Sequence, residues 1–223
     1  MEAWAWPIAA LAGALVGLVA AGEQWRAYSE PAFREERLQG RRLLVTRALV
    51  GLACAAACAV AFRPDYYDFG PALATAAFAV ALVVLSSTDF ERRRLPNSII
   101  YPAIIAAAAL CWAWPDRSIS EVWIGFGVAA GAAAGMYALG ALLGGARGTS
   151  DTPFGMGDVK LIGLEGLLLG WPAIVGALFV GVLLAWIPSL IMIVSGRGRR
   201  TFSYGPYLAA GCLVILLFFD RFG

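Results

Sequence analysis

Two aspartic acids stand next to apolar segments, in surroundings that suggest chemistry. Asp158 lies in the heptapeptide Gly-Met-Gly-Asp-Val-Lys-Leu at residues 155–161, at the mouth of an apolar run. Asp89 follows another apolar run and precedes a charged stretch at residues 91–94. A carboxyl at the end of a membrane helix is costly unless it has a partner or a function. A solvated aspartate that caps a helix is the alternative for Asp158 alone, but a second aspartate in a similar position favours a functional pair.

A pair of carboxyls offers hydrolysis without a metal or a covalent intermediate. Two carboxyls in a partly dry site repel each other when both are ionised, so one keeps its proton over a wide pH range. The ionised member can activate water as a general base, and the protonated member can protonate the leaving amine. These are the two roles that hydrolysis of a peptide bond requires. Catalytic triads that contain histidine are excluded, because the chain has no His.

No set of residues typical of a metal or cofactor site is present in the sequence. Structural zinc sites need about four ligands and often use closely spaced Cys pairs. The chain has four cysteines, no Cys-x-x-Cys pair and no Gly-rich phosphate loop. We therefore predict no metal and no cofactor. The cysteines, and the small residues of 125–135, are interpreted as packing between helices.

The elements that position the two aspartates are predicted to be membrane helices. Hydrophobic residues make up 61% of the chain and charged residues 14%, against roughly 45–50% and about 25% in soluble domains. Weakly charged segments of about 20 residues recur along the chain, which predicts an all-α polytopic membrane protein with about eight transmembrane helices. The expected spans are 3–21, 43–62, 70–88, 98–114, 122–144, 158–170, 171–194 and 204–219. The first is interpreted as a retained helix, because it lacks the basic start and the cleavage site of a signal peptide.

The basic residues fall unevenly on the two sides that eight crossings define. Only Arg63, Arg117 and Arg221 fall on one side, and the other 14 of the 17 Lys and Arg residues fall on the opposite side. Because Lys and Arg mark cytoplasmic loops, the rich side is predicted to face the cytoplasm and both termini to face outward. Asp89 and Asp158 then both lie at the cytoplasmic edge.

Three short motifs occur in order along the chain. Asp89 is followed by Leu-Pro-Asn at 95–97, residues 155–161 read Gly-x-Gly-Asp-x-Lys-Leu, and residues 204–208 read Tyr-Gly-Pro-Tyr-Leu. Together they resemble the prepilin peptidase (type IV leader peptidase) family of GxGD membrane aspartyl proteases, from about residue 70 to the end. The resemblance implies that Asp89 and Asp158 form a catalytic dyad. It also implies cleavage of type IV prepilin or pseudopilin precursors after a Gly, at the cytoplasmic face of the bacterial inner membrane.

Other residues of these motifs are expected to shape the site or bind substrate. Gly155 and Gly157 are expected to let the loop turn tightly and to admit an extended substrate backbone close to Asp158. Lys160 is expected to hold the substrate or to bias the charge of the dyad, with contact to a lipid headgroup as the alternative. Pro96 and Asn97 are predicted to shape the site as part of the first motif. The expected partners are the precursor and membrane lipids, and no nucleic acid.

Glu165 follows Asp158 by seven residues, so it lies on nearly the same helix face two turns deeper. An ionised Glu there would be expensive. We expect it to be protonated or hydrogen-bonded to another helix, in a structural rather than a catalytic role.

The first third of the chain departs from the family pattern. Full-length bacterial members carry, after the first helix, a cytoplasmic insert with two Cys-x-x-Cys pairs that is associated with zinc, whereas the loop 22–42 is short, charged and free of cysteine. We therefore divide the single membrane domain 1–223 into an atypical N-terminal part, 1–69, and a catalytic core, 70–223. In bifunctional members the same protein methylates the new N-terminus with S-adenosylmethionine. The missing insert predicts a short form without this second activity.

Two alternatives use the same residues differently. Presenilin-type intramembrane proteases also carry GxGD, but they would place Tyr-Asp within a helix and Pro-Ala-Leu after the GxGD. Here Tyr-Asp at 67–68 and Pro-Ala-Leu at 71–73 both precede Asp158, near an external loop. A transporter or carrier could instead use Asp89, Asp158 and Glu165 as a cation or proton path. The sequence shows no inverted repeat, and the motifs lie at the membrane edge, so the peptidase is the preferred interpretation.

Overall fold

The computed structural model describes residues 4–28, 40–64, 66–146, 155–195 and 203–219 as helices joined by turns, with no strand in these ranges. The elements are α1 (Ala5–Glu23), η1 (Gln24–Ala27), α3 (Gly40–Ala61), α4 (Phe69–Arg92), α5 (Asn97–Ala109), α6 (Ile119–Ala146), α7 (Met156–Leu169), α8 (Ala173–Val194) and α9 (Gly205–Phe218). The eight α-helices of these ranges correspond to the eight expected spans, which confirms the prediction of an all-α polytopic membrane protein.

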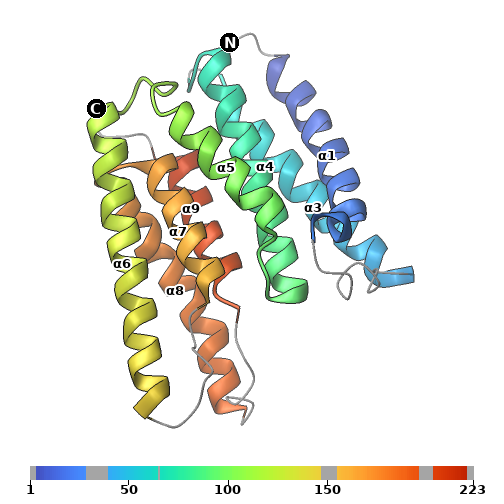
Figure 1. Cartoon of the computed structure of the whole chain (residues 1–223). Helices are drawn as coiled ribbons and strands as arrows, with labels where there is room; N and C mark the ends of the chain where they lie inside the picture. The colour runs from blue at the N-terminus through green and yellow to red at the C-terminus, as the bar shows by residue number, and fades with distance from the viewer. Residues whose placement is uncertain (1–3, 29–39, 65, 147–154, 196–202, 220–223) are drawn as a thin grey trace.

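The helices are of two lengths. Five helical segments are long and apolar enough to cross a membrane, namely α1 continued by η1, α3, α4, α6 and α8. Helices α5, α7 and α9 have 13, 14 and 14 residues and rise only about 20 Å, less than the roughly 30 Å of a hydrocarbon core. The last turns of α6 and α8 extend past the level at which α7 and α9 begin (Figure 1). The short helices α7 and α9 therefore begin inside the bundle, and α6 and α8 continue beyond their starting points.

One predicted boundary is clearly wrong. The span expected at 98–114 ends at Ala109, and the chain then turns before α6. Trp114, in this turn, is buried, and its indole N–H donates a hydrogen bond to the Thr75 hydroxyl at 2.9 Å. Pro115 also disfavours a helical conformation at the residue before it. The apolar character of 110–114 thus comes from packing on α4 and not from a continued helix.

Helix α7 is the centre of the larger part of the molecule. Every residue from Leu161 to Gly170 is buried, and α7 contacts α5, α6, α8 and α9. Close approach depends on small residues, because a Cβ added at Gly166 would lie 2.6 Å from the Ala129 Cβ of α6. The expectation that 125–135 packs closely holds at Gly125, which lies against Gly170, whereas Gly131 has no neighbouring atom within 4 Å of such a Cβ.

Helices α1 and α3 form a hairpin that packs on α4, on the side of the molecule away from α6 and α8 (Figure 1). Two glycines of α1 meet α3 closely, and a Cβ added at Gly13 would lie 2.7 Å from the Cys58 Sγ. Cys54 and Cys58 are free and buried in this contact. Helix α4 therefore makes most of the contact between the hairpin and the larger bundle, with smaller contacts from α9 and α5.

The basic residues within the described ranges separate between the two ends of the bundle, as expected. Arg26, Arg42 and Lys160 lie at the end where α4 finishes and α7 and α9 begin, whereas Arg63 and Arg117 lie at the other end. Part of the predicted loop 22–42 lies outside the described residues, as do Arg34, Arg37, Arg147, Arg197, Arg199, Arg200 and Arg221. That the basic end faces the cytoplasm stays a prediction.

Candidate active site

Asp89 lies in the last turn of α4, which runs four residues further than the expected span 70–88. The helix ends at Arg92, because Arg93 takes the left-handed conformation and its N–H closes the helix on the Asp89 carbonyl at 2.7 Å. The Asp89 residue is 6% exposed. A carboxyl so buried requires polar partners, and these come from a segment far along the chain.

The partners of Asp89 come from the start of α9. The Ser203 hydroxyl and the Gly205 N–H both donate hydrogen bonds to the Asp89 carboxyl. A Cβ added at Gly205 would lie 2.4 Å from Asp89 Oδ2, so any larger residue there would displace the carboxyl or the start of α9. Asp89 lies at the C-terminus of its own helix, where negative charge is disfavoured, but also at the N-terminus of α9, where it is favoured. The start of α9 therefore stabilises the carboxylate that the end of α4 carries.

Asp158 is the third residue of α7 and lies at that helix's N-terminus. Its side chain accepts a hydrogen bond from the Gly155 N–H at 3.1 Å, and its own N–H donates to the Gly155 carbonyl at 3.1 Å. This reciprocal pair caps the helix, and the helix dipole favours negative charge at this position. The side chain is partly exposed, unlike that of Asp89. Asp158 thus caps its helix, as the alternative interpretation in the sequence analysis expects, and it is also the more accessible of the two acids.

The two carboxyls are brought to the same end of the bundle by three helix ends. Asp89 comes from the end of α4, Asp158 from the start of α7, and α9 begins next to Asp89. The two carboxyls are close enough for Asp89 to act electrostatically on Asp158. Two-carboxylate hydrolysis requires two acids in one place, and the fold brings Asp89 and Asp158 to the same end of the bundle.

Lys160 connects the motif at residues 155–161 to the motif at residues 95–97. Its Nζ donates a hydrogen bond to the Asn97 Oδ1 at 2.8 Å and lies 4.6 Å from the centre of the Tyr101 ring. Asn97 is exposed and opens α5, and Pro96 is buried at the N-cap of that helix. Lys160 therefore holds α5 against α7.

The two glycines before Asp158 do not make the expected tight turn. Gly155 has φ −87° and ψ 155°, which is extended backbone, and Gly157 lies in the first turn of α7. A Cβ at Gly155 would lie 3.6 Å from Asp158 Oδ2, and one at Gly157 would lie 3.4 Å from the Leu95 side chain. Of the two glycines, only Gly155 therefore borders the Asp158 carboxyl, whereas Gly157 borders Leu95.

Glu165 is fully buried in α7, and neither of its carboxyl oxygens has a hydrogen-bond partner among the described residues. The expected hydrogen bond to another helix is therefore not found there. The charge of Asp158 acts electrostatically on the Glu165 carboxyl, and Glu165 in turn acts electrostatically on Cys212 of α9. Glu165 is deeper than the dyad and separate from the residues that surround Asp89.

The segment after α1 supports the end of α4. The Tyr28 hydroxyl donates to the Thr88 carbonyl at 3.5 Å and to the Arg94 carbonyl at 3.3 Å. Burial raises the pKa of Tyr28 to about 12, so the hydroxyl keeps the proton that these contacts need. The Ser98 hydroxyl donates to the Ala27 carbonyl. The turn between α4 and α5 is thus held from both of its ends.

Sequence reasoning missed Ser203 and gave Gly205 no role. Gly205 was noticed only as part of the Tyr-Gly-Pro-Tyr-Leu motif, and Ser203 lies just before it. The signal available in the sequence was a small residue and a hydroxyl at the start of the last apolar helix, on the side that carries both aspartates. Nothing local indicates that they contact Asp89, which is 114 residues earlier than Ser203.

Residues 76–194 of the chain match the type IV leader peptidase family. The chain belongs to this family. The match contains Asp89, the motif at 95–97 and the motif at 155–161, and it excludes the hairpin of α1 and α3 and the start of α9. Both acids of the site therefore lie inside the part that is typical of leader peptidases.

Curated proteins with similar sequences carry the same kind of name. The prepilin leader peptidases/N-methyltransferases of Burkholderia pseudomallei strains 1026b and K96243 are each 30% identical over 176 residues, which cover 74% of this chain and 52% of the relative. The protein of that name from Bacillus subtilis strain 168 is 28% identical over 147 residues, 64% of this chain and 54% of the relative. The chain spans about half the length of these relatives. No solved structure matches it.

Proposed function

We propose that this protein is a membrane aspartic endopeptidase that removes the leader from type IV prepilin or pseudopilin precursors. The observation that carries the proposal is that Asp89 and Asp158 lie at the same end of the bundle, where Asp89 acts electrostatically on Asp158. They come from two separate motifs of a leader peptidase family, and each carboxyl is oriented by a backbone N–H of its surroundings. The names of the relatives point to the same substrate class.

In the proposed reaction the dyad starts with one proton between its two carboxyls. The ionised carboxyl removes a proton from water as the water oxygen attacks the carbonyl carbon of the scissile peptide. The protonated carboxyl gives its proton to the amide nitrogen, and the C–N bond breaks. One proton is taken and one is given, so the pair needs no metal, no cofactor and no covalent intermediate.

The surroundings of the dyad suit a substrate that is anchored in the membrane. Gly155 has no side chain next to the Asp158 carboxyl, and this leaves space there for an extended substrate backbone. Lys160 is engaged with Asn97, so we assign it to holding α5 and α7 together rather than to binding a lipid headgroup. We assign the reaction to the cytoplasmic face of a bacterial inner membrane, and the basic residues at this end of the bundle support that assignment. The expected partners are the precursor and the surrounding lipids, with no nucleic acid.

The proposal is tested by incubating the purified full chain, in detergent and in lipid, with a precursor that has a basic leader, a Gly and an apolar helix. We expect a single cut after the Gly, located by mass spectrometry. Cleavage should persist in strong chelators and after thiol alkylation. If no cut forms at any pH or in any lipid, and liposomes that carry the protein show cation or proton flux that Asp158→Asn removes, the carrier interpretation replaces the peptidase.

The same assay tests the second activity that the names of the relatives include. The loop 22–42 lacks the cysteine-rich insert, and we propose that the product keeps a free, unmethylated N-terminus when S-adenosylmethionine is added. A gain of one methyl group on the mature N-terminus would show that methyl transfer does not need the insert.

A further inference from the structure

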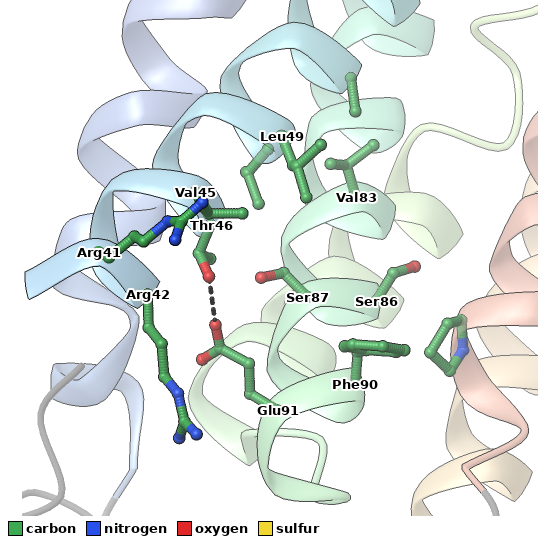
Figure 2. A pocket seen from close by; sticks show the side chains of 13 residues that line it. Arg41, Arg42, Val45, Thr46, Leu49, Val83, Ser86, Ser87, Phe90 and Glu91 are labelled. Atoms are coloured by element: carbon green, nitrogen blue, oxygen red, sulfur yellow. Dashed lines mark hydrogen bonds between the residues drawn. The ribbon is translucent and has the colours of Figure 1, made fainter. Parts of the chain in front are cut away.

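A groove of about 750 Å³ lies beside the site, between α3 and α4. It is closed at one edge by Pro206 of α9, next to the glycine that contacts Asp89. Its walls include Arg41, Arg42, Val45, Leu49 and Ala53 of α3 and Val83 of α4. Figure 2 shows the apolar side chains of Leu49 and Val83 further along the groove from its charged end. The groove is thus apolar along its length and charged at its mouth.

The polar groups of the walls are occupied within the protein. The Thr46 hydroxyl donates to Glu91 at 2.9 Å across the groove (Figure 2), and Gln24 donates to the same carboxyl. The Ser86 hydroxyl donates to the Leu82 carbonyl at 2.7 Å. Glu91 is therefore engaged by neutral donors and does not neutralise the cations at the mouth.

Two cations at the mouth remain for a ligand. Arg41 and Arg42 open α3 and are exposed, and neither forms a salt bridge with an acid in the part of the chain that the structure describes. They lie at the basic end of the bundle, at the level at which lipid headgroups of the inner leaflet are expected. A mouth with two guanidinium groups above an apolar groove is complementary to an anion that carries a hydrocarbon chain.

We propose that the groove binds an anionic phospholipid, with its phosphate on Arg41 and Arg42 and one acyl chain along Val45, Leu49 and Val83. A helix of 10–12 Å diameter would fill the groove with fewer than about two turns, so its size suits an acyl chain better than a substrate helix. Clusters of basic residues at the cytoplasmic end of membrane helices attract anionic lipids.

The position of this lipid gives the hairpin a role outside the matched family region. One wall is α3, which lies before residue 76, and the other is α4, which carries Asp89. A lipid in the groove fills the gap between them and contacts Pro206 at the start of α9. The hairpin would then hold a lipid as part of the wall behind the site, while Asp89 itself faces Ser203 and Gly205.

The test measures binding and does not depend on peptidase activity. The purified chain is titrated with phosphatidylglycerol or with phosphatidylcholine in detergent, and retained lipid is counted by native mass spectrometry. We expect one tightly held phosphatidylglycerol and about tenfold weaker retention of phosphatidylcholine. The double variant Arg41→Gln/Arg42→Gln should lose this preference, whereas Arg26→Gln, an exposed cation outside the groove, should keep it.

A matched pair of bulky variants tests the apolar part. Ala53→Phe fills the groove from α3 and should abolish retention of the lipid, whereas Ala48→Phe, the same change at an exposed position of α3 outside the groove, should leave it unchanged. Equal retention of both lipids, or unchanged retention in Ala53→Phe, would overturn the proposal. Displacement of the lipid by an apolar precursor helix, with the same sensitivity to Ala53→Phe, would assign the groove to substrate instead.

Discussion

In the bundle of α4 to α9, α7 is buried without interruption from Leu161 to Gly170, whereas α1 buries only Gly13, Gly17 and Ala21. The two regions have similar apolar compositions but use them differently. The bundle surrounds one central helix, and the hairpin presents most of its apolar side chains outward. An apolar residue that faces lipid loses little, because lipid tails are as apolar as a protein interior. Among the described residues, the larger packed interior is therefore that of the bundle, and this is the part that carries Asp89 and Asp158.

The contacts between the two regions are largely polar at the end that carries the site. Gln24 and Thr46 of the hairpin donate to Glu91 of α4, and Tyr28 donates to the carbonyls on either side of the end of α4. We infer that the bundle makes the chemistry possible and that the hairpin steadies one edge of it. Changes in the bundle should therefore affect cleavage, and changes in the hairpin should affect stability.

The largest effect is expected from the dyad. Asp89→Asn and Asp158→Asn should each lower the rate of precursor cleavage by roughly a thousandfold or more, because one acid cannot serve as both acid and base. The double variant should resemble either single one. Asp68→Asn, which changes an exposed acid at the other end of α4, is the control and should cleave normally. Robust turnover by either dyad variant would remove that residue from the mechanism.

The next effect is expected at Gly205. An added Cβ would lie 2.4 Å from Asp89 Oδ2, so Gly205→Ala must displace the carboxyl or the start of α9. Misplacement of a catalytic group by about 1 Å costs on the order of a hundredfold in rate. Gly70→Ala on α4 has open space around the new methyl and serves as the control. Normal kinetics in Gly205→Ala would show that the start of α9 does not position Asp89.

A smaller effect is expected where Lys160 meets Asn97. Lys160→Met removes a hydrogen bond from a charged donor and should lower the cleavage rate by about tenfold. Asn97→Ala should act through the same contact, so the double variant should be no worse than Lys160→Met. Tyr101→Phe keeps the ring under the ammonium group and should leave the rate unchanged. Additive effects of the two changes would instead indicate that Lys160 binds substrate directly.

The hairpin should change stability more than rate. Thr46→Val deprives Glu91 of one donor and should lower the free energy of unfolding by about 1 kcal/mol, a shift of about 2–4 °C in the thermal midpoint. Thr46→Ser keeps the hydroxyl and should restore the midpoint. The cleavage rate of the folded protein should stay close to wild type in both. A loss of rate without a loss of stability would place the hairpin inside the catalytic unit.

The smallest effect is expected at Glu165. Because neither oxygen has a hydrogen-bond partner among the described residues, Glu165→Gln removes no contact that those residues make with its carboxyl, and it should keep most of the cleavage activity. The measurement is the cleavage rate as a function of pH, because the charge of Asp158 acts electrostatically on Glu165. A loss as deep as that of the dyad variants would make Glu165 a third functional acid of the bundle.

The sequence by itself determined the class of the protein and the chemical identity of its site. The uncharged segments predict helices because a membrane leaves no other way to satisfy the backbone, and the eight helices appear where they were expected. The segregation of basic residues placed Asp89 and Asp158 at one end, which is where they lie. The motifs identified the family, since they are short and local and can be read without knowing which helices touch.

Tertiary structure decided how the acids are held. Ser203 and Gly205 reach Asp89 across more than a hundred residues, and Lys160 meets Asn97 across 63. The early end of α5, the extended backbone at Gly155 and the lack of a hydrogen-bond partner for Glu165 among the described residues were also not predicted from the sequence. Each depends on which helix faces which, and in helices that are apolar all round most faces look alike. Length and apolar composition identify a membrane helix, but only packing selects the neighbour that each side chain meets.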